Sequence, residues 1–141
     1  MRQQTKYIVV HSAATTSEMD IGVKEIDRWH RAPPHNFLKV GYHFVIRRDG
    51  TAEVGRDVDE IGAHCKGFNR ISVGICMAGG LGKDGEAESN FTNEQYDALR
   101  ELLYTLQAMY PDSTIVGHRD LKKSTECPSF NVKDFVNDMF I

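Results

Sequence analysis

Short apolar runs bounded by turn-forming residues recur along the chain. YIVVH (7–11) is β-branched at its centre, SVGICMAGG (72–80) is apolar and ends in glycines, and STIVG (113–117) is a third such run. These runs are typical of strands that are buried on both faces of a sheet. GYHFVIRRDGTAEVGR (41–56) predicts a β-hairpin, because two strand-like runs flank an Asp-Gly turn signal.

Helical spacing of apolar residues appears between these runs. In GVKEIDRWH (22–30) apolar residues recur at every third position ahead of a Pro-Pro pair, which predicts a short helix. FTNEQYDALRELLYTLQAMY (91–110) is the clearest helix, since a Thr-x-x-Gln capping box precedes an apolar stripe. Asn131 is expected to cap a last helix, whose apolar residues share one face.

Strands and helices interleave over the whole length. This order predicts one α/β domain spanning residues 1–141, with a central mixed β-sheet flanked by helices. No repeat or Gly/Ser linker divides the chain, and 141 residues are enough to bury a core without disulfides. We expect the domain to act as a monomer.

The composition excludes several classes of protein. Hydrophobic residues make up 40% of the chain and charged residues 26%, and the net charge of −3 argues against a nucleic-acid binder driven by bulk electrostatics. No run reaches the roughly 18 apolar residues that a membrane span needs. The apolar run near the N-terminus is too short for a secretory signal, so we expect synthesis to leave the protein in the cytoplasm.

Two histidines and a cysteine follow the predicted strands. His11 ends the first strand, His118 follows the strand at 113–117, and Cys127 lies on the polar loop after it. Ligand sites in open α/β sheets lie beyond the carboxyl ends of the strands, so these side chains meet if the strands are neighbours. Two imidazoles and one thiolate suit Zn²⁺ with a fourth position open to water, which predicts a zinc site at the strand ends.

Two other interpretations use the same residues. Cys127 with a histidine base and an orienting third group would make a thiol hydrolase, although no local signature surrounds the cysteine. Alternatively, the histidines are hydrogen-bonded strand ends and Cys127 is a small buried side chain. The three cysteines cannot all pair, so free thiols or a metal ligand are more natural than a disulfide framework.

The remaining histidines divide by position. His43 lies inside a predicted strand and is expected to be a core histidine, or one that supports a ligand, rather than a ligand itself. His30 and His35 flank the Pro-Pro loop and are expected to be solvated. His64 lies on a Gly-rich loop, where it either contacts a substrate or belongs to a plain loop.

Six blocks of sequence, in order, carry a family resemblance. They cover nearly the whole chain and read IVVHSAAT, IGVKEIDRWH, VGYHFVIRRDGTAEVGRD, GAHCKGFNRISVGICMAGG, NFTNEQYDALRELL and HRDLKKSTECPSF. The chain resembles the type-2 N-acetylmuramoyl-L-alanine amidases, which include phage lysozymes and animal peptidoglycan recognition proteins. It is most similar to the phage branch. The resemblance implies one zinc ion per chain, bound by His11, His118 and Cys127.

The resemblance also implies catalytic residues. Tyr42 is expected to line the active site, where its hydroxyl orients water or donates to an oxyanion. Thr125 occupies a position where some relatives carry a lysine, and it is expected to donate one hydrogen bond to the tetrahedral intermediate. Cys76 stands where another branch has a catalytic glutamate, so that branch's glutamate base does not carry over.

The activity implied is hydrolysis of the amide bond between N-acetylmuramic acid and L-alanine in peptidoglycan. Trp29 and His64 are expected to contact the muropeptide stem, with Lys66 and Arg70 as weaker candidates for its carboxylates. Such an enzyme resembles an endolysin that reaches the cell wall after release from the cytoplasm. Two non-enzymatic roles stay open: a peptidoglycan-binding module, and a protein-interaction role such as binding a phage RNA polymerase.

Overall fold

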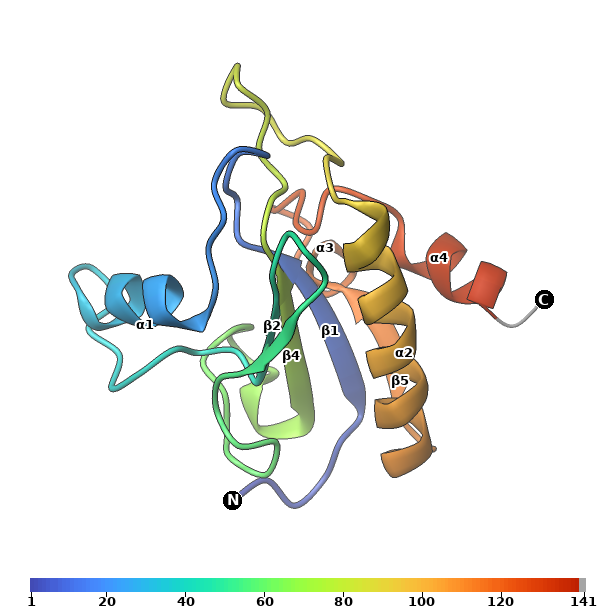
Figure 1. The fold of residues 1–141 in the computed structure, drawn as a ribbon. Helices are drawn as coiled ribbons and strands as arrows, with labels where there is room; N and C mark the ends of the chain where they lie inside the picture. Colours follow the sequence, from blue (N-terminus) through green and yellow to red (C-terminus); the bar gives the residue numbers. More distant parts are fainter. Residues whose placement is uncertain (140–141) are drawn as a thin grey trace.

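Five strands form one mixed sheet in the computed structural model, which describes residues 1–139 (Figure 1). The sheet order is β3-β2-β4-β1-β5; the pairs β2–β4, β4–β1 and β1–β5 are parallel, and the pair β2–β3 is antiparallel. This confirms the predicted fold class. The strand bounds are β1 Tyr7–Ser12, β2 Phe44–Ile46, β3 Ala52–Val54, β4 Ser72–Met77 and β5 Thr114–Gly117.

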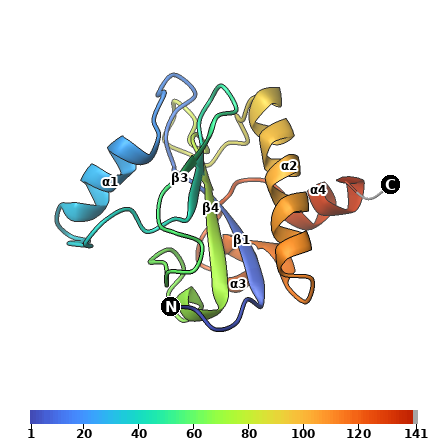
Figure 2. The same cartoon turned by 60° about the horizontal axis from the view of Figure 1, so that its bottom comes forward.

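Helices cover both sides of this sheet. The helix α1 lies on one side, while α2 and α4 lie on the other (Figures 1 and 2). Among the residues described, no helix is long and apolar enough to cross a membrane. The helix bounds are α1 Val23–Arg31, α2 Asn93–Met109, α3 His118–Leu121 and α4 Val132–Met139, with a 3-10 turn at Asn69–Ile71.

The predicted caps are present at two of these helices. The Thr92 hydroxyl accepts a hydrogen bond from the Gln95 amide at 3.0 Å, and the Gln95 side chain accepts one from the Thr92 amide at 3.0 Å. The Asn131 side chain likewise accepts one from the Asp134 amide at 3.0 Å. Each bond satisfies an amide that has no partner within its helix, so the two starts are fixed locally.

Side chains alternate between the two faces of each strand, so the buried residues form two clusters, one on each face of the sheet. On β1 and β4, Ile8, Val10 and Ile75 are among the buried residues packed with α2 and α4. The intervening positions face the opposite side, where Cys76 packs with Ile26 of α1. Register pairs Val9 with Gly74 and His11 with Cys76. The sheet face turned away from α2 therefore presents His11, Gly74 and Cys76 side by side.

The structure differs from prediction in the loop expected after residue 117. It begins with the short helix α3 instead, because the Asp120 carboxylate accepts a hydrogen bond from the Gly117 amide at 2.8 Å and the Lys122 amide donates to the His118 carbonyl at 2.9 Å. Four residues are too few to show helical periodicity in a sequence. The turn fixes His118 immediately beyond the end of β5.

Candidate metal centre

Two parallel strands bring His11 and His118 together. β1 and β5 are neighbours in the sheet, and the two imidazole rings lie 4.5 Å apart between centroids. The sulfur of Cys127 joins them, so that one donor atom from each of these three residues lies within 4.8 Å of the others. The structure therefore brings together all three residues that the sequence nominated as ligands.

The segment after α3 carries Cys127 back to the sheet. The Arg119 amide donates to the Cys127 carbonyl at 2.8 Å, which ties the returning chain to α3. Next to the cysteine, the Thr125 hydroxyl accepts a hydrogen bond from the Cys127 amide at 3.2 Å. Finally, the Ser12 amide donates to the Cys127 sulfur at 3.1 Å. These contacts aim the sulfur at the end of β1.

Burial sets the protonation of the three groups. It lowers the pKa of His11 well below its ordinary value, with further lowering from His64 and His118, and it lowers the pKa of His118 with help from Lys122. Both rings are therefore neutral and carry a lone pair. Burial raises the pKa of the Cys127 thiol, which the hydrogen bonds from Ser12 partly oppose.

This donor set fits zinc better than it fits a thiol nucleophile. Two neutral imidazoles and one sulfur with an amide donor beside it are ligands that Zn²⁺ prefers, and binding would displace the thiol proton. A nucleophilic cysteine instead needs a depressed pKa. Burial raises the pKa of Cys127, and the neutral His11 and His118 bring no positive charge that would lower it without a metal, which disfavours the thiol-hydrolase interpretation.

Tyr42 stands beside the centre. Its ring centroid lies 5.1 Å from that of His11, and its side chain packs against the buried cluster that contains Cys76. Burial first, and then Cys76 and Cys127, raise the pKa of Tyr42 well above its ordinary value. The hydroxyl thus stays protonated and remains a hydrogen-bond donor.

A cavity of about 520 Å³ opens next to Tyr42. Among the described residues that line it there is no carboxylate. Its lining consists of His30, His35, Phe37, Tyr42, Ala63, His64, Cys65, Lys66, Asn69 and Lys122. None of the three donor residues lines the cavity; Tyr42 and His64, which do line it, contact His11.

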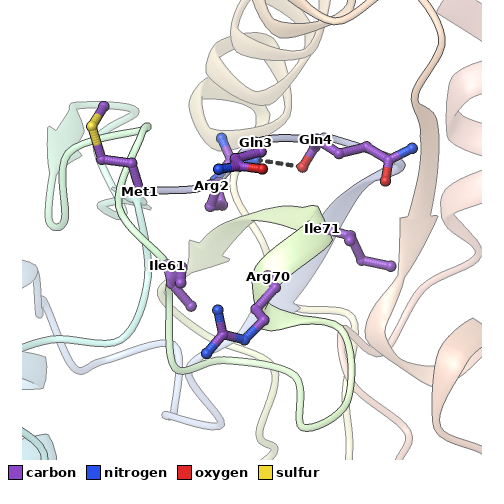
Figure 3. Close-up of a pocket in the computed structure, with 7 residues that line it drawn as sticks. All are labelled: Met1, Arg2, Gln3, Gln4, Ile61, Arg70 and Ile71. Atoms are coloured by element: carbon purple, nitrogen blue, oxygen red, sulfur yellow. Dashed lines mark hydrogen bonds between the residues drawn. The ribbon is translucent and has the colours of Figure 1, made fainter.

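The cavity lining separates the sequence candidates for substrate contact. Lys66 and His64 line it, whereas Trp29 does not and is 39% exposed on α1. Arg70 lines a different hollow of about 330 Å³ (Figure 3). That hollow lies before the N-terminal ends of β1 and β4, away from His11 at the other end of β1.

The histidines flanking the Pro-Pro loop were expected to be solvated, and for His30 this is wrong. His30 is half-buried, and its Nδ1 accepts a hydrogen bond from the Gly41 amide at 2.8 Å. Burial, followed by the charges of His35 and Arg56, lowers its pKa to about 4. His35 is exposed as expected, but both rings line the cavity. Sequence reasoning missed this contribution.

Two further histidines lie behind the centre. His43 is fully buried, its Nδ1 accepting from the Gly74 amide at 2.9 Å and its Nε2 lying 2.8 Å from the Glu60 carbonyl, so the expected core role is confirmed. His64 not only lines the cavity but also places Nδ1 at 2.9 Å from Nε2 of His11. It touches a candidate ligand directly, which the sequence did not reveal.

Comparisons with known proteins agree with this architecture. Residues 1–130 match the family model for N-acetylmuramoyl-L-alanine amidase. The endolysin of Enterobacteria phage K11 is 47% identical over 135 residues, covering 96% of this chain and 87% of that protein. The endolysin of Klebsiella phage KP32 is 48% identical over 132 residues, covering 94% and 85%.

Solved structures show the same fold. The amidase LysC from Clostridium intestinale URNW superposes with a TM-score of 0.80 at 26% identity, covering 98% of this chain and 87% of that one. Peptidoglycan recognition protein-LE, solved in complex with tracheal cytotoxin, gives a TM-score of 0.74 at 25% identity, covering 90% and 76%. Together with the family match and the endolysin relatives, these likenesses show that the chain belongs to the N-acetylmuramoyl-L-alanine amidase family.

Proposed function

We propose that this amidase depends on zinc and hydrolyses the bond between N-acetylmuramic acid and the L-alanine of the peptidoglycan stem, as a phage-type endolysin. The observation that carries the proposal is the convergence of His11, His118 and Cys127, with donor atoms within 4.8 Å of one another beside a cavity. These three residues would hold the ion. When bound, zinc supplies a Lewis acid for the amide carbonyl and lowers the pKa of a water molecule.

The protein's own groups support this chemistry. The neutral rings of His11 and His118 offer lone pairs without needing to lose a proton. The Ser12 amide, 3.1 Å from the Cys127 sulfur, favours the thiolate over the thiol once a cation is near. The cavity has no described carboxylate, so no acidic side chain from that lining competes for the substrate or serves as base.

Tyr42 is the proposed catalytic donor. Its protonated hydroxyl would donate to the substrate carbonyl oxygen as negative charge develops there. The departing amine needs a proton, and the attacking water gives one up; we propose that this proton is relayed past Tyr42, whose hydroxyl ends the reaction protonated. Thr125 is proposed to assist, because its oxygen accepts from the Cys127 amide while its own proton stays available.

The cavity suits a stem peptide. Lys66 and Lys122 line it, and their ammonium groups are proposed to meet peptide carboxylates. One structural relative was solved with tracheal cytotoxin, a monomeric diaminopimelic acid-type peptidoglycan. We propose that peptidoglycan fragments enter the present cavity so that the scissile amide lies between Tyr42 and the three ligands.

The test is a metal and cleavage measurement on the purified protein. We expect about one zinc per chain by mass spectrometry, and release of soluble stem peptides from purified peptidoglycan that stops with a chelator and returns with zinc. Activity that survives the chelator but is lost to a thiol alkylator would instead support the Cys127 hydrolase. Zinc without cleavage would leave a peptidoglycan-binding module.

Release from the cytoplasm is proposed as the trigger. Cells that express the protein are expected to stay intact until the inner membrane is permeabilised, for example with chloroform, and then to lyse. Lysis without permeabilisation would contradict this part of the proposal. A chain with alanine at Cys127 serves as the inactive control in the same assay.

A further inference from the structure

We propose that His64 is a positioning residue that selects the ring nitrogen with which His11 binds metal. The inference rests on the proposed function, since it concerns a ligand of the same centre. His64 was expected to contact substrate, but both ring nitrogens have partners within the protein: one contacts His11, and the other contacts Ser72. The assignment follows from which atoms along this chain of contacts can donate and which can only accept.

Three contacts in series make up the relay. Nε2 of His11 lies 2.9 Å from Nδ1 of His64, and Nε2 of His64 lies 3.2 Å from the hydroxyl oxygen of Ser72. That hydroxyl donates to the Phe68 carbonyl at 2.7 Å. The relay therefore ends on a backbone carbonyl, which accepts hydrogen bonds and never donates them.

The Phe68 carbonyl at the end of the relay determines which atom carries the proton in each of the three hydrogen bonds. Because the only proton of the Ser72 hydroxyl goes to Phe68, the oxygen must accept from Nε2–H of His64. A neutral His64 then has a lone pair on Nδ1, which accepts from Nε2–H of His11. Neutral His11 is left with its lone pair on Nδ1. The relay thus points this nitrogen, and not Nε2, to the metal.

The opposite direction is incompatible with metal binding. If His64 carried a proton on both nitrogens, it would donate to Nε2 of His11 and use up that lone pair. His11 would then hold its proton on Nδ1 and have no free lone pair. Only the arrangement ending on Phe68 leaves His11 able to act as a ligand while its contact with His64 persists.

The ring of His64 packs against two glycines that leave room for it. It lies over Gly74 of β4, where a Cβ atom would come within 2.5 Å of the ring, and against Gly62, where one would come within 2.7 Å. The backbone amides of His64 and Cys65 both donate to the Asn69 side chain at 2.9 Å. The ring thus has little freedom to turn away from His11. Histidine ligands commonly depend on such a partner, which is worth about 10- to 100-fold in metal affinity.

The tautomers are measurable without metal. In the metal-free protein with ¹⁵N-labelled histidine, NMR is expected to show His11 and His64 both protonated at Nε2. After zinc is added, the Nδ1 resonance of His11 is expected to shift as the metal-bound nitrogen. Protonation of metal-free His11 at Nδ1, or a zinc shift at its Nε2, would overturn the inference.

Paired variants test the same point through affinity. His64→Leu removes the acceptor and is expected to weaken zinc binding about 10- to 100-fold, measured by competition with a chelator. His64→Asn places a carbonyl oxygen near the Nδ1 position, so it is expected to restore most of that affinity and the wild-type visible spectrum of the Co²⁺-loaded protein. His35→Leu makes the same change on an exposed histidine of the cavity and is expected to keep the zinc affinity.

The outcomes separate this inference from the proposed function. Wild-type protein that binds no zinc contradicts the proposed function. Wild-type protein that binds zinc while the Leu and wild-type affinities are equal overturns the role of His64 alone. The thermal midpoints of the metal-free variants show whether folding is affected, and if the Leu variant does not fold, the tautomer measurement on the wild type decides.

Discussion

The sulfur of Cys127 accepts a hydrogen bond from the backbone amide of Ser12 at 3.1 Å, although the two residues lie 115 positions apart in the sequence. An amide donor stabilises a thiolate more than a thiol, so the contact suits a metal ligand. Cys127→Ala is therefore expected to lower bound zinc from about one per chain to near zero and to abolish hydrolysis of peptidoglycan. Mass spectrometry of the intact protein and a peptide-release assay measure the two effects.

Cys65 provides a matched control for this variant. Its thiol is buried and lines the cavity beside the centre, but it is not among the three donors. Cys65→Ala is expected to retain zinc. Equal loss of zinc from both variants would show that general disruption of this region, and not loss of a ligand, explains the Cys127 result.

Tyr42→Phe removes one hydroxyl and keeps the ring that packs near His11. If the hydroxyl donates to developing negative charge, kcat is expected to fall about 10²- to 10³-fold while zinc content stays the same. Steady-state kinetics with a soluble muropeptide and a metal assay give both numbers. An unchanged kcat would remove Tyr42 from the mechanism, and a parallel loss of zinc would assign it a structural role.

Thr125→Val tests the contribution of Thr125 to catalysis, which we expect to be smaller than that of Tyr42. The substitution deletes the oxygen that accepts the Cys127 amide at 3.2 Å, so a loss of about 1 kcal/mol in folding stability is expected. A further drop in kcat, smaller than that of Tyr42→Phe, is expected if its proton reaches the oxyanion. Thr125→Ser keeps the hydroxyl and is expected to behave like the wild type in urea unfolding and in kinetics.

The sequence predicted the site residues that lie at the ends of regular strands. β-branched runs predicted β1 and β5, and the rule that ligands gather beyond strand ends predicted that His11 and His118 would meet. Their meeting required only that the two strands be parallel neighbours. Because strand pairing depends on the whole sheet, the local sequence could not predict that β1 and β5 are neighbours, and only the structure shows it.

The contact that the His64 loop makes with His11 could not be predicted from the sequence, for a physical reason. The contact between His64 and His11 depends on Gly74, a strand residue whose missing side chain makes room for the ring. Nothing in the spacing of these three residues signals that relationship, because it arises from the stacking of a loop over a sheet face.

Helix geometry explains why Trp29 and His30 exchanged roles. Relative to the buried Ile26, a residue three positions later turns about 60° one way around the helix, and one four positions later turns about 40° the other way. His30 is thereby carried toward Gly41 and the cavity, and Trp29 toward solvent. A spacing of three alone did not distinguish the two sides of the helix.

This difference leads to a prediction about substrate binding. Phe37 lines the cavity and Trp29 does not. Phe37→Ala is expected to lower kcat/KM for a soluble muropeptide several-fold, since it removes apolar contact area, whereas Trp29→Phe is expected to leave it unchanged. A substantial loss of kcat/KM in the Trp29 variant alone would restore the sequence-based expectation that this residue contacts the stem peptide.

His30 predicts a pH dependence of folding stability. Its pKa is about 4 in the folded protein against an ordinary value of 6.5, mainly because it is partly buried. The unfolded chain therefore binds more protons between these values, so the contribution is complete above pH 6.5 and is lost as the pH falls toward 4. Each unit of lowering corresponds to about 1.4 kcal/mol, and because solvent partly reaches the ring we expect a loss nearer 1 kcal/mol.

His30→Asn isolates this contribution. The asparagine oxygen can replace Nδ1 as acceptor for the Gly41 amide, which now lies 2.8 Å away, but it does not titrate. Urea unfolding of the metal-free proteins from pH 7.5 to 4 is expected to show a shallower loss of stability in the variant. The slope that remains belongs to the other buried histidines with lowered pKa values, such as His43, and near pH 4 also to carboxylates with lowered pKa values, such as Glu60. If the two curves run parallel across this window, protonation of His30 does not oppose folding, and its burial does not have the effect inferred here.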